Sequence, residues 1–158
     1  MENVNVIRTG FMAPDFTLGD INGTVFKMSE NLAGNFLCLC FFPNGDSDKT
    51  AYLKELSQGL PDTAAKLPVK IIGISPAKSG HLKQLQDKLK LNFPLLPDPQ
   101  LEVASRYYVV DGYSAKPAVY FSVFVIDDTG VVRYRASEIA GSSRFSFDEL
   151  KSEIPKLL

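Results

Sequence analysis

Few side chains in this sequence could carry nucleophilic, redox or metal chemistry. The chain has two cysteines, Cys38 and Cys40, and a single histidine, His81. A Cys-x-Cys pair lacks the usual ligand spacing of zinc sites and of redox-active dithiols, and one histidine cannot build a metal site alone. We therefore predict no metal centre and no bound cofactor.

Both cysteines lie in the apolar run at residues 35–42, a pattern typical of a strand buried on both faces. Residues two apart in a strand point to the same side, with Cα atoms about 6.6–7 Å apart, which is the long limit for a disulfide. Free cysteine is also among the residue types most often buried. Core packing is therefore the favoured interpretation of Cys38 and Cys40. A redox-active dithiol is the alternative, which thiol labelling would distinguish.

A second candidate site follows the same strand, where residues 43–50 read PNGDSDKT. Pro43 ends the strand, and Ser47 or Asp48 can cap a following helix. Sites in open α/β sheets form beyond the carboxyl ends of the strands, and a helix N-terminus favours an anion. This loop is therefore the predicted place for ligand binding or catalysis.

The elements that must position this loop alternate along the chain. Long apolar runs predict strands at residues 35–42, 69–74 and 120–126. Amphipathic stretches predict helices at residues 51–59, 80–91, 100–107 and 147–157, the last with Ser146 as its N-cap. Shorter strands are predicted at residues 15–18, 24–28 and 131–135. This order predicts an α/β fold with a mixed central β-sheet flanked by helices and an N-terminal β-hairpin extension.

Composition narrows the classes of function. The chain has 158 residues, of which 45% are apolar and 22% charged, with a net charge of -1. The length and composition predict one globular domain over residues 1–158. A net charge near zero gives no electrostatic reason to expect binding to nucleic acid or to an anionic membrane. No apolar run approaches the ~20 residues of a membrane helix, and the first residues lack the pattern of a secretion signal. We therefore expect a cytoplasmic protein.

Several motifs together resemble one family. The segment GFMAPDFTL at residues 10–18, FFP at residues 41–43, NFPLLPDP at residues 92–99 and FVID at residues 124–127 occur in the family's order. On these residues the chain resembles a peroxiredoxin of the alkyl hydroperoxide reductase/thiol-specific antioxidant (AhpC/TSA) family, most closely its bacterioferritin-comigratory-protein branch. The resemblance covers about the whole chain and implies a thioredoxin-like fold.

The resemblance also implies where the family's site residues lie. The family's loop reads Pro-x-x-x-Thr/Ser-x-x-Cys; Pro43 and Ser47 match it, but Thr50 occupies the position of the peroxidatic cysteine. Phe121 occupies the position of the family's arginine, and Glu55 that of the branch's second, resolving cysteine. Three chemically essential positions therefore depart from the pattern while the scaffold motifs stay.

Three hypotheses follow for the activity. The resemblance implies an antioxidant oxidoreductase that reduces peroxides with a thiol. The departures at Thr50 and Phe121 instead favour a family member without peroxidase activity, which acts as a binding or regulatory module, because a threonine hydroxyl stays protonated near neutral pH and cannot cycle through sulfenic acid. The third hypothesis is a weak redox protein that uses Cys38 and Cys40. The expected ligand is a peroxide or another small molecule, and the sequence leaves open a monomer or a homodimer.

Overall fold

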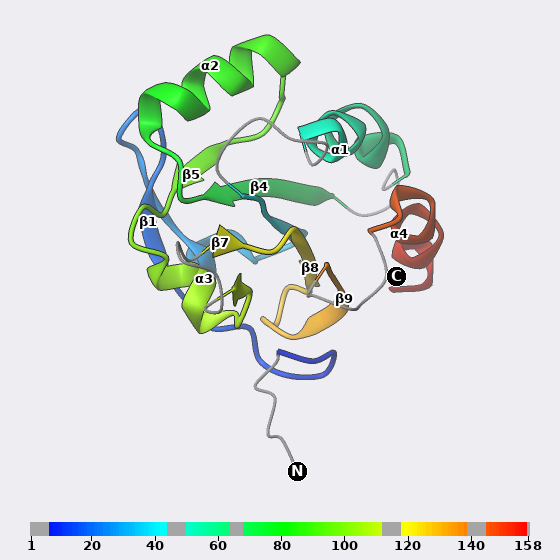
Figure 1. Cartoon of the computed structure of the whole chain (residues 1–158). Coiled ribbons are helices and arrows are strands. Elements are labelled where there is room, and N and C mark those ends of the chain that lie inside the picture. The colour runs from blue at the N-terminus through cyan, green and yellow to red at the C-terminus, as the bar shows by residue number, and fades with distance from the viewer. Residues whose placement is uncertain (1–6, 44–49, 64–67, 112–117, 139–144, 158) are drawn as a thin grey trace.

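A mixed five-stranded sheet forms the centre of the fold (Figure 1). The computed structural model describes residues 7–43, 50–63, 68–111, 118–138 and 145–157. The strand order is β5-β4-β3-β8-β9, with β3, β4 and β5 parallel and β8 and β9 antiparallel to their neighbours. The strands span Phe36–Phe41 (β3), Val69–Ser75 (β4), Leu95–Pro97 (β5), Ser122–Ile126 (β8) and Val132–Ser137 (β9). The predicted thioredoxin-like α/β architecture is confirmed.

Helices cover both faces of this sheet. One face carries α1, α2 and α4, and the other carries α3 (Figure 1). The helices span Thr50–Thr63 (α1), Ser79–Leu89 (α2), Glu102–Arg106 (α3) and Phe147–Glu153 (α4). No helix in the described ranges is long and apolar enough to cross a membrane.

Strand β3 faces a separate hydrophobic core on each side. Its cysteines, with the flanking Phe36 and Phe42, face the core under α1, α2 and α4. Leu37, Leu39 and Phe41 face the other core, against α3 and the N-terminal segment. Because both faces are covered, the strand needs apolar residues at every position, and this explains the continuous apolar run in the sequence.

The predicted N-terminal hairpin is present as β1 (Thr17–Gly19) and β2 (Val25–Lys27), which pair antiparallel. Its turn is closed by the Asp20 carboxylate, which accepts hydrogen bonds from the backbone N–H groups of Asn22 and Thr24 at 2.8 and 2.9 Å. Gly23 takes a φ of 84° there, a left-handed conformation that glycine adopts without steric cost. A short 3-10 helix, η1 (Met28–Asn31), leads from the hairpin toward β3.

Several short elements were not predicted. They are β5 and the small antiparallel pair β6 (Val110–Asp111) and β7 (Ala118–Val119). Each has only two or three residues, and β5 ends in Pro97. Strands of that length have no readable alternation, and they form because their neighbours offer hydrogen-bonding partners.

The ends of the helices follow local capping rules. The Ser146 side chain accepts a hydrogen bond from the Glu149 N–H at 3.1 Å, which confirms the predicted N-cap of α4. The helix changes at Ile154 into a 3-10 turn, η2 (Ile154–Leu157), where Pro155 has no N–H to continue the helix. Helix α3 is capped by the buried Asp98 carboxylate, which accepts from the N–H groups of Glu102, Val103 and Ala104.

The glycine at position 59 lets α1 approach α4 closely. A Cβ atom there would lie 2.6 Å from Cζ of Phe147, whereas a Cβ atom at Gly80 in α2 would meet nothing within 4 Å. We expect Gly59→Ala to lower the free energy of unfolding by about 1 kcal/mol, because the crowding outweighs the gain in helix propensity. Gly80→Ala, the matched control, should be neutral or stabilising by up to about 1 kcal/mol. Urea-induced unfolding measures both, and equal effects of the two changes would contradict the packing argument.

Candidate functional site

The candidate site lies at the carboxyl end of β3, where the chain passes toward α1. Pro43 lies two residues after the end of this strand and is half-buried, and Thr50 is the first residue of α1 and is also half-buried. Ser47 lies outside the described residues. Glu55, one turn further along α1, is exposed. The structure thus brings Pro43 and Thr50 to the edge of the sheet where the sequence predicts a site.

Phe121 reaches the same edge from the other side. It directly precedes β8, and β8 pairs with β3 so that Ser122 lies opposite Phe41. Its side chain is 1% exposed. Phe121 therefore extends the core to the end of β3, and its ring occupies interior space.

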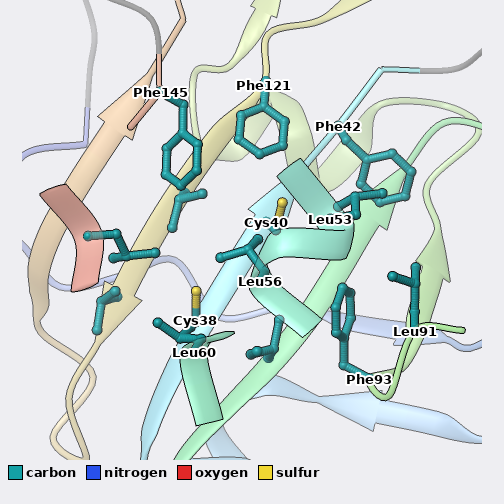
Figure 2. Packing of buried hydrophobic residues seen from close by; sticks show 14 of the residues in the cluster. Cys38, Cys40, Phe42, Leu53, Leu56, Leu60, Leu91, Phe93, Phe121 and Phe145 are labelled. Atoms are coloured by element: carbon teal, nitrogen blue, oxygen red, sulfur yellow. The ribbon is translucent and has the colours of Figure 1, made fainter. Parts of the chain in front are cut away.

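Two further aromatic rings enclose Phe121. Tyr52 from α1 and Phe145 from the segment before α4 pack against it, with ring-centroid distances of 4.7 and 5.2 Å. Tyr52 and Phe145 also contact each other at 5.1 Å, so that the three rings form a closed aromatic cluster. Figure 2 shows the Phe121 and Phe145 rings side by side above the rest of this core. Tilted and edge-on contacts of this kind add stability beyond the burial of apolar area.

Glu138, which follows β9, ties the aromatic cluster together. Its Oε2 atom accepts hydrogen bonds from the Tyr52 hydroxyl at 3.2 Å and from the Phe145 backbone N–H at 2.7 Å. Its own backbone N–H donates to the Phe121 carbonyl at 2.8 Å. One half-buried residue thus joins α1 and the segment before α4 through its carboxylate, and the residue before β8 through its backbone N–H.

The sequence did not identify Tyr52, Phe145 or Glu138 as site residues. Tyr52 was visible as an apolar position of the predicted helix at residues 51–59, but its hydroxyl partner lies 86 positions away in the sequence. Phe145 and Glu138 fall outside any periodic pattern. The resemblance marks Phe121 as unusual, because an aromatic ring occupies the position of a cation. That was the one signal in the sequence for apolar neighbours at this place, since a buried ring packs against apolar groups.

The two cysteines lie below the aromatic cluster, inside the core. Both are fully buried, and Figure 2 shows their sulfur atoms directed toward the α1 layer, near Leu56 and Leu60. Burial raises the pKa of the Cys38 thiol to about 12. Burial, together with the neighbouring Cys38, also raises the pKa of Cys40 well above its ordinary value. Both groups are therefore neutral thiols at physiological pH, which supports core packing and disfavours a redox-active dithiol.

Comparisons with known proteins agree with this architecture. The model of the AhpC/TSA family matches residues 9–135. A Mycobacterium tuberculosis protein that carries a peroxiredoxin name is 30% identical over 141 residues, covering 84% of this chain and 86% of its own. The crystal structure of peroxidoxin BcpB from Mycobacterium tuberculosis superposes with a TM-score of 0.83 at 25% identity, over 96% of this chain and 99% of that one. A cysteine-to-serine mutant of peroxiredoxin 6 from Arenicola marina has the same fold, with a TM-score of 0.82 at 22% identity over 96% of this chain and 73% of that one.

The fold is thus the thioredoxin-like fold of peroxiredoxins, and the candidate site lies where the central strand of that fold ends. With the match over residues 9–135, the chain belongs to the AhpC/TSA family. Its relatives and structural neighbours include proteins named as bacterioferritin-comigratory peroxiredoxins, as the sequence motifs indicated.

Both native thiols should resist labelling in the folded protein. We expect Cys38 and Cys40 to react with an aromatic disulfide reagent at pH 8 only when urea unfolds the chain, because the buried thiols are neutral and inaccessible. A cysteine introduced at half-buried position 50 (Thr50→Cys) is the matched control and should react without urea. Fast labelling of the native chain would contradict the core assignment.

The buried thiols should also make stability depend on alkaline pH. Their pKa values are raised in the folded state, whereas thiols of the unfolded chain ionise near pH 8.5. The unfolded state therefore loses protons first, and the free energy of unfolding should fall as pH rises above about 8.5, by up to ~1.4 kcal/mol per unit for each thiol. Urea unfolding between about pH 7.5 and 9.5 tests this below the range where tyrosines of the unfolded chain ionise. The variant Cys38→Ala/Cys40→Ala should be less stable but should lack this slope.

Proposed function

We propose that this chain is a peroxiredoxin-family protein that lacks cysteine-peroxidase activity and acts as a binding or regulatory module. The observation that supports this most directly is that α1 begins at Thr50, and that its first turn packs Tyr52 against Phe121, which belongs to an aromatic cluster at the end of the strand. On the family pattern, Pro43 and Ser47 keep the scaffold of the loop, while Thr50 and Phe121 replace its nucleophile and its cation.

The chemistry of oxygen and sulfur supports this proposal. Peroxide reduction by the family's route needs a thiolate that attacks one peroxide oxygen, becomes a sulfenic acid and is then reduced by a second thiol. A threonine hydroxyl remains protonated near pH 7 and has no corresponding oxidised state that a thiol can reduce. The branch's resolving position also lacks sulfur, because it holds Glu55.

The electrostatics of the site support it as well. Among the described residues, the Glu138 carboxylate accepts hydrogen bonds from the Tyr52 hydroxyl and the Phe145 N–H, and the Glu138 backbone N–H donates to the Phe121 carbonyl. A nearby negative charge opposes the formation of a thiolate and of an anionic leaving oxygen. A cation in that place would favour both. A cysteine restored at position 50 alone would therefore lack the cation that favours its thiolate.

The proposal also covers the domain organisation, the location and the partners of the protein. We propose a single cytoplasmic domain over residues 1–158 that works as a monomer or homodimer. Its partner would be a small molecule, with a peroxide as the first candidate, and neither nucleic acid nor a membrane is proposed as a partner. The active alternative, a thiol reductase that uses Cys38 and Cys40, is disfavoured by the complete burial of both thiols.

Peroxide consumption in the presence of a dithiol reductant tests the proposal. The native chain should consume hydrogen peroxide no faster than the reductant alone, because it lacks an ionisable thiol at position 50. Thr50→Cys should be slow, and Thr50→Cys/Phe121→Arg should be faster, because the introduced guanidinium adds a cation at the position where the family pattern has its arginine. The matched control Thr50→Cys/Phe121→Leu opens space without adding charge and should remain slow.

Rapid thiol-dependent turnover by the native chain would contradict the proposal. If Cys38→Ser/Cys40→Ser then abolished this turnover, the dithiol alternative would be correct. Because Phe121→Arg places a charge in an aromatic core, thermal unfolding of each variant shows whether a loss of rate reflects unfolding.

A further inference from the structure

The arginines of the described chain fall into two groups. Arg106 and Arg133 form ion pairs with Glu102 and Asp127, at 2.9 and 3.3 Å. Within the described residues, no hydrogen bond or ion pair is found for the guanidinium of Arg8 or of Arg135. The Nε atom of Arg135 is, moreover, buried without any hydrogen-bond partner. A buried donor that is left unpaired in a folded protein calls for a physical reason.

The backbone brings these two arginines close together. Residues 8–11 form a turn in which the Phe11 N–H donates to the Arg8 carbonyl, and the Gly10 N–H donates to the Val132 carbonyl of β9 at 2.7 Å. Arg135 lies on the same strand, opposite Phe124 of β8. Burial, together with the positive charge of Arg8, lowers the pKa of Arg135. Two like charges are thus held near each other by hydrogen-bonded backbone.

This arrangement is unfavourable for the protein alone and favourable for an anion. Guanidinium groups present fixed forks of N–H donors that match the oxygens of phosphate and carboxylate. An anion between the two would cancel their repulsion.

We propose that Arg8 and Arg135 form a binding site for a phosphate-type oxyanion that bridges their guanidinium groups. A dianion is favoured over a single carboxylate because it would be attracted by two positive charges. The site is separate from Thr50, because Phe124 packs in the core on the α3 face of the sheet and α1 covers the opposite face. It therefore does not depend on whether the chain reduces peroxides.

Titration of the full chain with inorganic phosphate tests this site. Sodium chloride is used to keep the ionic strength constant, and the arginine Nε–H signals are followed by NMR while calorimetry gives the affinity. We expect saturable binding of phosphate that shifts the Arg135 Nε–H signal. Acetate, which tests a carboxylate in place of phosphate, should bind more weakly. Arg8→Gln and Arg135→Met should each weaken phosphate binding by about tenfold or more, since each removes a charge-assisted hydrogen bond.

Arg133→Gln is the matched control, because it removes the same charge from the same strand but from an arginine that already has Asp127. It should change the phosphate affinity by less than about twofold, as expected for a screened charge at the surface. In chloride alone, Arg8→Gln and Arg135→Met should melt at or above the temperature of the native chain, because they relieve repulsion.

Three results would overturn the proposal. The first is the lack of a saturable response of the native chain to phosphate. The second is an equal loss of affinity in Arg133→Gln, which would indicate general charge attraction. The third is a clear loss of thermal stability in Arg135→Met in chloride, which would mean that the folded chain already supplies a partner for this guanidinium.

Discussion

Burial of β3 on both faces is the constraint on which the rest of the structure depends. The strand pairs with β4 on one side and with β8 on the other, so that its backbone is hydrogen-bonded along both edges. Because both faces are covered, its side chains must be apolar on both. Cys38 and Cys40 are part of this constraint, because they fill the core under α1. The same burial that makes them useful for packing removes the ionised form on which thiol chemistry depends.

The end of β3 is stabilised by packing where an active thiol site would require charge. Phe121, Tyr52 and Phe145 form one aromatic cluster, and Glu138 holds it through two hydrogen bonds to its carboxylate and one from its backbone N–H. Full burial of one such ring contributes about 1.5–3 kcal/mol, whereas a buried guanidinium without a partner costs free energy. Residues at this edge therefore serve the fold more directly than they serve chemistry.

The sequence predicted those parts of the fold whose patterns are local. The apolar runs located β3, β4 and β8, the amphipathic pattern located α2, and Ser146 located the start of α4. Strands β5, β6 and β7 depend on the hydrogen bonds of their neighbours, and their two or three residues carry no period that could be read. For the site, motifs indicated Pro43, Thr50 and Phe121, but Glu138 and Phe145 join them through contacts that no spacing in the sequence encodes.

The proposed loss of peroxidase chemistry is compatible with this fold for a physical reason. The scaffold also depends on the close approach of α1 to α4 at Gly59 and on the Asp98 cap, and neither of these contacts involves the side chain at position 50 or 121. Replacing a thiol by a hydroxyl at a half-buried helix start changes little in packing, but it removes the redox cycle of sulfur entirely. Replacing a cation by Phe121 adds apolar burial. The two changes therefore act in the same direction, since each preserves or strengthens the folded state while it weakens the means of forming a thiolate.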